Sequence, residues 1–280
     1  MSRDDLIKSI TEKKSFLCVG LDTDIKKIPK HLLSSDDPVY EFNKFIVDAT
    51  IDYAIAYKPN LAFYESLGPG GLESLEKTME FIPDDVFTIA DAKRGDIGNS
   101  SQMYARAFFE RMDFDSITVS PYMGHDSILP YFEYKGKWAI VLALTSNPGS
   151  KDFQHLDIAG DHDDFFDVEE MELFEIVVKR ISELGTKENL MFVVGATKTS
   201  YMKHIRNLVP DHFLLVPGIG AQGGNLEEVA SNGINSDCGL IVSASRSIIY
   251  ASDGDDFASM ARKSSMQLRD KMSELLQRYM

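Results

Sequence analysis

Cysteine is almost absent from this 280-residue sequence, which contains only Cys18 and Cys238. Two cysteines cannot form a disulfide framework, and no C-x-x-C pair is present to suggest a structural zinc site. The histidines between residues 125 and 212 follow no metal-ligand spacing, and neither a G-x-S-x-G motif nor a Walker A loop occurs. These absences argue against a disulfide-stapled protein, a zinc domain and a P-loop enzyme.

Long hydrophobic runs are also missing. The longest clean apolar run is Trp138–Leu144, whereas a membrane-spanning helix needs about 20 apolar residues. Residues 1–16 lack the basic-then-apolar form of a signal peptide. We therefore expect a soluble, cytoplasmic protein with no membrane partner.

Positive charge is scarce, because 29 Lys and Arg residues stand against 44 Asp and Glu residues, for a net charge of −15. The negative electrostatic field of such a protein repels nucleic acid as well as anionic membranes, so we expect no nucleic-acid partner. It also repels small anions. Any anionic substrate therefore needs a local cluster of Lys and Arg side chains.

No linker rich in Pro, Gly or Ser divides the chain, and its hydrophobic content of 44% is ordinary for a globular protein. At about 150 residues per domain the length allows one or two domains, and a (β/α) barrel typically needs roughly 250 residues. We predict one domain over residues 1–280. A polar, acid-rich insertion at about residues 151–167 is expected to be a solvated loop.

Short runs rich in Val, Ile, Leu and Phe recur along the chain and are uniformly apolar, as expected for parallel strands buried on both faces. Segments with helical periodicity lie between them. Eight alternating units predict a (β/α)8 barrel, with a doubly wound open sheet as the alternative. The predicted strands are Phe16–Leu21, Tyr53–Lys58, Val86–Asp91, Ser116–Ser120, Trp138–Leu144, Leu190–Ala196, Phe213–Pro217 and Gly239–Ser243.

The densest chemical signal is the segment IADAKRGDIG at residues 89–98. Asp91 and Lys93 end a predicted strand two residues apart, so their side chains should share a side, and Asp96 follows the Gly95 turn. Buried charges are costly unless they are paired, so this pattern favours function at the rim where barrel enzymes keep their chemistry. A purely structural Asp91–Lys93 pair is the alternative.

Two other predicted strands also end in charged residues, Asp22 after the first and Lys58 at the end of the second. In a barrel, both would converge with Asp91 and Lys93 on one mouth. Charges of alternating sign keep one another ionised. Each residue alone could be an ordinary surface charge, but four that converge predict a catalytic array.

Glycine-rich sequence follows the seventh predicted strand, at Val216–Gly224, and Arg246 follows the eighth. Barrels often bind phosphate after these two strands, where backbone N–H groups and Arg can hold the anion. The G-x-G-x-x-G spacing is a weak Rossmann signal, because no acidic residue follows in a βαβ unit. A glycine-rich loop without a ligand is the alternative. Ser146 and Asn147, after the fifth strand, could contact a polar heterocycle or form a turn.

In combination, these motifs resemble the orotidine 5′-phosphate decarboxylase family over roughly Phe16–Ala251. The resemblance implies a (β/α)8 barrel that forms homodimers. It also implies conversion of orotidine 5′-monophosphate to UMP and CO2 without metal or organic cofactor.

The resemblance also assigns roles to individual residues. Lys58, Asp91, Lys93 and Asp96 would form the catalytic array, in which Lys93 is the proton donor and Asp96 acts in the partner's site. The implied substrate contacts are Asp22 at the ribose, Ser146 at the pyrimidine, Gln222, Gly223 and Arg246 at the phosphate, and Ile97 and Ser100 across the interface. Many family members use a Tyr in the phosphate loop, and none occurs between Gly218 and Gly233.

Two other functions remain as alternatives. A related barrel that decarboxylates or condenses sugar phosphates shares the Asp-x-Lys-x-x-Asp pattern but uses Mg²⁺ and carries a Glu on its second strand. Here Lys58 stands at that strand and would repel the metal. A barrel that only binds phosphate ligands would need the glycine-rich loop and Arg246, but not the charged array.

Overall fold

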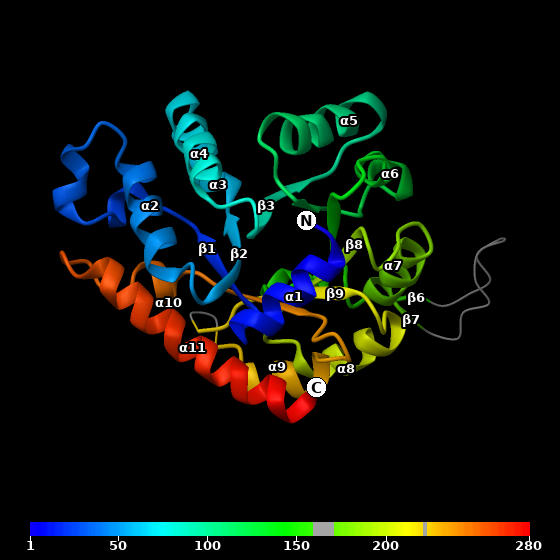
Figure 1. Ribbon diagram of the computed structural model, residues 1–280. Helices are drawn as coiled ribbons and strands as arrows, with labels where there is room; N and C mark the ends of the chain where they lie inside the picture. The colour runs from blue at the N-terminus through cyan, green and yellow to red at the C-terminus, as the bar shows by residue number, and fades with distance from the viewer. Residues whose placement is uncertain (159–170, 221–222) are drawn as a thin grey trace.

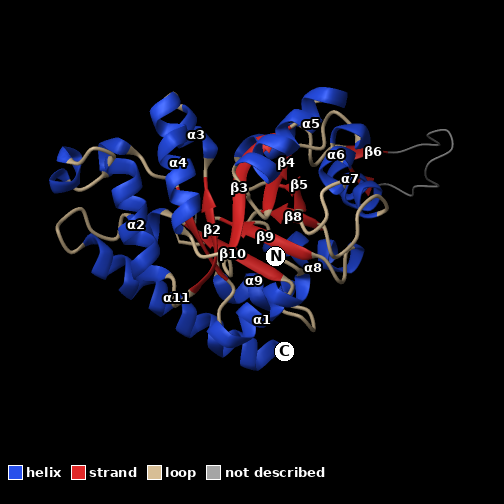
Figure 2. Cartoon of the chain, turned by 45° about the horizontal axis from the view of Figure 1, so that its top comes forward, coloured by secondary structure: helices blue, strands red, loops and turns tan. Residues whose placement is uncertain are grey.

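The computed structural model describes residues 1–158, 171–220 and 223–280, and within these ranges eight parallel strands close into a barrel (Figure 2). The order around the barrel is β1-β10-β9-β8-β5-β4-β3-β2. Closure confirms the predicted (β/α)8 fold and excludes the open sheet. The strands are β1 (Leu17–Leu21), β2 (Ala54–Pro59), β3 (Phe87–Arg94), β4 (Ser116–Val119), β5 (Trp138–Leu144), β8 (Leu190–Val194), β9 (Phe213–Pro217) and β10 (Leu240–Ala244).

Burial explains why these segments form strands. Every residue of β1, β2, β4, β8 and β10 is buried, as expected when side chains face either the barrel interior or the surrounding helices. The bounds of β5 and β9 match the predicted ranges residue for residue. By contrast, β3 continues three residues beyond the predicted end at Asp91, to Arg94.

Helices surround the strands on the outside (Figure 1). The longest is α11, which runs along α2 and α9 and brings the C-terminus back beside the barrel. The helices are α1 (Arg3–Lys13), α2 (Pro38–Thr50), α3 (Leu61–Glu65), α4 (Pro69–Phe81), α5 (Gly98–Arg106), α6 (Leu129–Phe132), α7 (Leu173–Ser182), α8 (Thr199–Leu208), α9 (Leu226–Gly233), α10 (Arg246–Ile249) and α11 (Phe257–Tyr279).

Helix α1 covers the amino ends of the strands. The amino group of Met1 lies 2.6 Å from Asp115 Oδ1, just before β4, and Arg3 donates to the carbonyl of Asp211, just before β9. Lys13 Nζ donates to the carbonyl of Ala54 at the start of β2 (2.7 Å). These contacts close the barrel at the amino ends of the strands, so the carboxyl ends form the open end.

The predicted loop at residues 151–167 is described only through Ile158. A 3₁₀ turn (Pro148–Asp152) leads into this loop, and the described part of the loop contains β6 (Asp157–Ile158), which pairs antiparallel with β7 (Met171–Glu172). This two-stranded pairing holds the described start of the insertion near α7. Residues 159–167 lie outside the described ranges.

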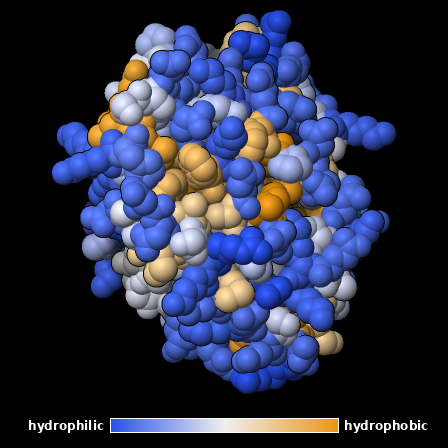
Figure 3. All heavy atoms as spheres, turned by 60° about the vertical axis from the view of Figure 1, so that its left-hand side comes forward, coloured by the Kyte–Doolittle hydropathy of each residue, from blue (hydrophilic) through white to orange (hydrophobic). Residues whose placement is uncertain are grey.

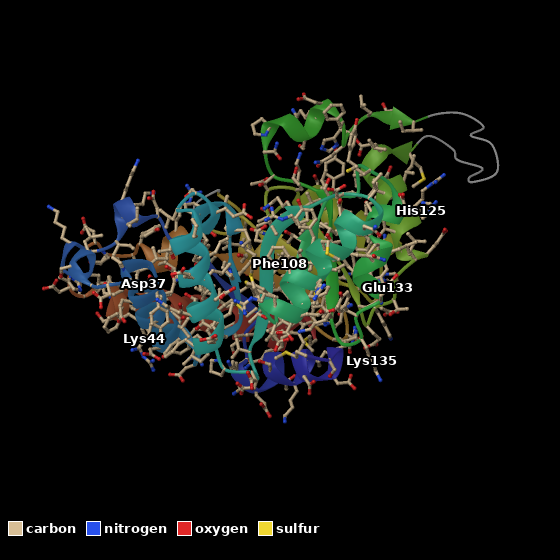
Figure 4. All side chains as sticks on the ribbon, turned by 90° about the horizontal axis from the view of Figure 1, so that it is seen from above. Asp37, Lys44, Phe108, His125, Glu133 and Lys135 are labelled. Atoms are coloured by element: carbon tan, nitrogen blue, oxygen red, sulfur yellow. The ribbon has the colours of Figure 1, made fainter. Side chains whose placement is uncertain are left out.

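The surface on the α2 side of the molecule is largely hydrophilic, with a band of hydrophobic residues across its middle (Figure 3). Seen from above, Asp37 and Lys44 mark α2 on one side of the molecule, and Glu133 and Lys135 lie on the opposite side (Figure 4). Among the described helices, none combines the length and apolarity needed to cross a membrane.

Candidate active site

A cavity of about 480 Å³ opens at the carboxyl ends of the strands. Loops that follow different strands line it, so residues far apart in the sequence meet there. This volume is typical of small-ligand sites. The cavity brings together residues that the sequence singled out: Asp22, Lys58, Asp91, Lys93, Ser146, Asn147, Gly218 and Arg246.

The charged side chains in this cavity form a connected cluster. Asp91 accepts hydrogen bonds on both carboxylate oxygens, from Lys58 Nζ at 2.7 Å and from Lys93 Nζ at 2.5 Å. Lys58 Nζ also lies 3.9 Å from Asp22 Oδ1. The predicted convergence of these four residues at one mouth is therefore confirmed.

Burial differs sharply across the cluster. The side chains of Lys58 and Asp91 are 6% and 11% exposed, whereas that of Lys93 is 51% exposed. Lys58 and Asp91 therefore form the buried, desolvated part of the cluster, whereas the ammonium of Lys93 is its exposed part, on the side of the cavity. A ligand entering the mouth would meet Lys93 before it met Lys58.

The electrostatics of the cluster favour full ionisation. Burial alone would raise the pKa of the Asp91 carboxyl, but Lys58 and Lys93 hold that pKa well below its usual range. Burial alone would lower the pKa of Lys58, but Asp91 and Asp22 raise it above its usual range. The site therefore keeps an anion between two cations at neutral pH.

Strand β3 does not reach Lys93 as a regular strand. Ala90 pairs with Ile117 and Arg94 pairs with Val119, so three residues of β3 stand opposite Thr118 alone. Lys93 adopts a φ of 48°, in the left-handed region. A non-glycine residue in a sparsely populated conformation costs on the order of 1–3 kcal/mol and persists only where its surroundings hold it. The side chains of Asp91 and Lys93 therefore meet because of a bulge in β3, and not because residues two apart in a regular strand point to the same side.

Asp22 lines the cavity and has one carboxylate oxygen buried near Lys58. Its Oδ1 atom is buried and has no hydrogen-bond partner in the described part of the chain. The loop that carries it is clamped by Tyr250, whose hydroxyl donates to the Asp22 carbonyl at 2.9 Å and accepts from Asp24 N–H at 2.7 Å. Asp22 is therefore held in place at the cavity wall, where its carboxylate, 21% exposed, could accept from a ligand hydroxyl.

The ends of β9 and β10 form the opposite wall. Gly218 and Gly220 have φ values of 109° and 84°, which other residues adopt only with strain, so the glycines are required for this turn. Arg246 is exposed at the start of α10 and lines the cavity. Gly223 is described but does not line the cavity, and the predicted phosphate contact Gln222 lies outside the described residues.

The loop after β5 supplies the remaining wall, where Ser146 and Asn147 line the cavity. Gln154 holds this loop, because its Oε1 atom accepts from the backbone N–H of Thr145 at 2.8 Å. Thr145 Oγ1 donates in turn to Asn147 Oδ1 at 2.6 Å. The described start of the insertion therefore braces the wall that contains Ser146.

Besides Gly223, three predicted residues lie away from the cavity: Asp96, Ile97 and Ser100. Asp96 accepts from the N–H of Ile97 at 2.8 Å, and the Ile97 side chain is 53% exposed. Ser100 is exposed in the first turn of α5. Within one chain, these residues do not join the cluster at Asp91.

Several cavity residues were missed by sequence reasoning: Asn60, Thr118, Thr145, Gln154, Ser243 and Ser245. Asn60 could have been found, because it follows Lys58 by two residues at the same rim and forms a bridge with Asp91. Thr118 lies inside an apolar run, and Gln154 lies in the insertion. Neither carried a sequence signal of its own.

A second cavity, of about 470 Å³, lies at the opposite end of the barrel beside Thr88 and Asp115. In (β/α)8 enzymes chemistry occurs at the carboxyl ends of the strands, whereas the amino ends serve stability. The cavity at the carboxyl ends contains the Lys58–Asp91–Lys93 cluster, and the second cavity does not. We therefore assign the candidate active site to the cavity at the carboxyl ends of the strands.

The closed barrel and the charged, ligand-sized cavity at its carboxyl face place the protein among the (β/α)8-barrel enzymes. The profile of the orotidine 5′-phosphate decarboxylase / HUMPS family matches residues 15–260, and the chain belongs to that family. It is a carbon–carbon lyase.

Individual relatives agree with this assignment. The orotidine 5′-phosphate decarboxylase of Bacteroides fragilis (strain YCH46) is 56% identical over 279 residues, which cover 99% of this chain and 98% of the relative. The corresponding enzyme of Flavobacterium johnsoniae is 52% identical over 279 residues, with coverage of 99% and 98%. The structure of Leishmania donovani OMP decarboxylase superposes with a TM-score of 0.82 at 33% identity, covering 98% of this chain and 99% of that one.

The cluster makes a prediction about stability. Asp91→Asn removes the anion between Lys58 and Lys93 and leaves the buried Lys58 ammonium with only the more distant Asp22 carboxylate, which should lower the free energy of unfolding at pH 7 by about 3 kcal/mol. The pKa of Asp91 is lowered on folding, so its contribution is complete above the unfolded value of about 3.9 and is lost as pH falls below it. Urea unfolding should show a difference from wild type that is constant from about pH 5 to 8. Equal stabilities at pH 7 would contradict the ionised cluster.

Proposed function

We propose that the protein catalyses the decarboxylation of orotidine 5′-monophosphate (OMP) to UMP and CO2, the last step of de novo UMP synthesis. The observation that carries the proposal is the Lys58–Asp91–Lys93 cluster, in which one carboxylate lies between two ammonium groups at the open end of the barrel. Relatives named for this activity are more than half identical over nearly the full chain.

The chemistry suits such a cluster. Loss of CO2 from C6 of the pyrimidine breaks the C6–carboxylate bond and leaves the electron pair on C6, with little resonance stabilisation. Enzymes lower barriers by roughly 8–23 kcal/mol, and a preorganised electrostatic environment supplies much of this without reorganisation. In the proposed mechanism, Asp91 lies beside the departing carboxylate. Lys93 stabilises the charge that develops at C6 and then donates the proton that replaces CO2.

The walls of the cavity suit the remaining parts of the substrate. Asp22, whose carboxylate is partly exposed at the cavity wall, would accept from the ribose hydroxyls, and Ser146 would contact the pyrimidine. Arg246, together with Gln222 and Gly223, would bind the phosphate. The positive charge of Arg246 would offset the net charge of −15, and phosphate binding away from C6 could supply energy for organising the site.

We further propose that two copies of the chain form a homodimer with shared sites, in which Asp96, Ile97 and Ser100 complete the site of the partner. Exposed apolar side chains at the start of α5 support this. Ile97, directly before α5, and Met103, about one turn after Ser100, are 53% and 55% exposed. Large exposed apolar side chains that cluster commonly mark an interface.

The Mg²⁺-dependent sugar-phosphate reaction is the less favoured alternative. The buried ammonium of Lys58, 2.7 Å from Asp91 and 3.9 Å from Asp22, would repel a divalent cation from those carboxylates. A barrel that only binds phosphate ligands would not need this buried cluster, which is costly to desolvate. The cavity charges therefore favour the metal-independent decarboxylase.

We also propose that residues 1–280 act as one barrel domain, with the insertion at about 151–167 as an appendage, and that the enzyme is cytoplasmic. Cys18 and Cys238 support the location, because both are free thiols. Buried free thiols are compatible with a reducing compartment.

The direct test follows the absorbance change when OMP is added, with and without exhaustive chelation by EDTA. The purified protein should consume OMP, release one CO2 per UMP, and keep full activity in EDTA. Activity that is lost in EDTA and restored by Mg²⁺ would favour the sugar-phosphate reaction. Binding of OMP or UMP without turnover would favour the binding barrel.

Lys93→Ala should lose nearly all turnover while the barrel stays folded, because Lys93 both stabilises charge at C6 and supplies the proton. The loss should fall on kcat more than on KM, since the interaction strengthens in the transition state. Lys135→Ala, which changes an exposed lysine in the turn before the amino end of β5, is the matched control and should behave as wild type. A Lys93→Ala variant with more than about a tenth of wild-type kcat would disprove the assigned role.

Mixing two inactive variants tests the shared site. In a heterodimer of Lys93→Ala and Asp96→Ala chains, one site carries both lesions and the other carries neither. If subunits reassort randomly and the sites are independent, about half the dimers are mixed, which gives roughly a quarter of wild-type activity. If exchange is demonstrated by a labelled subunit and the mixture stays as inactive as its parents, Asp96 acts within its own chain.

A further inference from the structure

The bulge in β3 leaves the backbone at Lys93 without a regular ladder partner. Three residues, Asp91 to Lys93, stand opposite Thr118 between the pairs Ala90–Ile117 and Arg94–Val119. The side chain of Thr118 fills the gap. Its Oγ1 atom accepts a hydrogen bond from the Lys93 N–H at 2.9 Å.

The same hydroxyl also reaches the carboxylate of the cluster. Thr118 Oγ1 lies 3.2 Å from Asp91 Oδ1, to which it can donate, and 3.5 Å from the carbonyl of Ala90. Asp91 Oδ1 is also the atom that accepts from Lys93 Nζ. One hydroxyl thus contacts both the carboxylate and the main chain of the lysine that is bonded to it.

Thr118 is itself immobilised. It is 1% exposed, and its neighbours Ile117 and Val119 are buried core residues of β4. A buried, β-branched side chain has restricted rotamers, so its hydroxyl is a fixed reference point. Lys93, in contrast, is half-exposed and has a backbone conformation that needs support.

We propose that Thr118 is a positioning residue of the active site. Its hydroxyl fixes the Asp91 carboxylate and the Lys93 main chain together, and so sets where the Lys93 ammonium stands relative to the reacting carbon. The proposal rests on the proposed decarboxylation of OMP. It extends that function to a buried strand residue that would not itself touch the substrate's reacting atoms.

Thr118→Val keeps the shape of the side chain and removes the hydroxyl. With OMP as substrate, kcat should fall at least about tenfold, because a displacement of about 1 Å can cost roughly a hundredfold in rate. KM should change much less, since the phosphate and ribose contacts lie elsewhere in the cavity. Thr118→Ser, which keeps the hydroxyl, should restore most of kcat.

The chain offers a matched control at the other end of the barrel. The Thr88 hydroxyl accepts from the N–H of Asp115 at 2.9 Å and donates to its carboxylate at 3.0 Å, so it makes the same two kinds of bond. Thr88→Val should therefore lower the melting temperature while leaving kcat and KM near wild-type values. Comparing the two valine variants separates a loss of stability from a loss of positioning.

The outcomes distinguish this proposal from the proposed function. A wild-type protein that does not decarboxylate OMP overturns the function on which the proposal rests. A wild-type protein that is active, with a folded Thr118→Val variant of unchanged kcat, overturns the positioning role alone. A kcat loss that Thr118→Ser does not reverse, or that Thr88→Val reproduces, also overturns it. A kcat loss confined to Thr118→Val supports it.

Discussion

The Asp91 carboxylate, bonded on one oxygen by Lys58 and on the other by Lys93, is the interaction on which the site depends. A buried charge without a partner tends to lose its ionisation, whereas neighbouring charges of alternating sign keep one another ionised. Lys58 is buried and Lys93 is half-exposed, so one end of the cluster is fixed in the core and the other is accessible from the cavity. This asymmetry lets one side chain serve as anchor and another as reagent.

The barrel makes this cluster possible by holding its members on separate, rigid strands. Lys58 lies on β2 and Asp91 on the neighbouring β3, so their separation is set by the strand ladder rather than by flexible loops. Helix α1 closes the opposite end. The reactive charges therefore gather at one open mouth, together with the Asp22 acceptor and the Arg246 guanidinium.

Sequence patterns predicted the barrel because strands buried on both faces leave short, uniformly apolar runs, and the run at Trp138–Leu144 matched β5 completely. They also predicted the meeting of Lys58, Asp91 and Lys93, since strand ends converge in a closed sheet. The bulge at Lys93 was not predictable, because it depends on pairing with β4. Gln154 was missed for a similar reason, as its bond to Thr145 arises only from the folded insertion.

The ionisation of Asp91 within the folded protein is the quantity to measure. Carbon-13 NMR of aspartate-labelled protein can follow its carboxyl carbon, which is identified by its absence from Asp91→Asn spectra. At about pH 4 an ordinary aspartate is close to half protonated. The Asp91 resonance is predicted to stay at its ionised position from pH 7 to that point. A titration midpoint at or above about 4 would contradict the account.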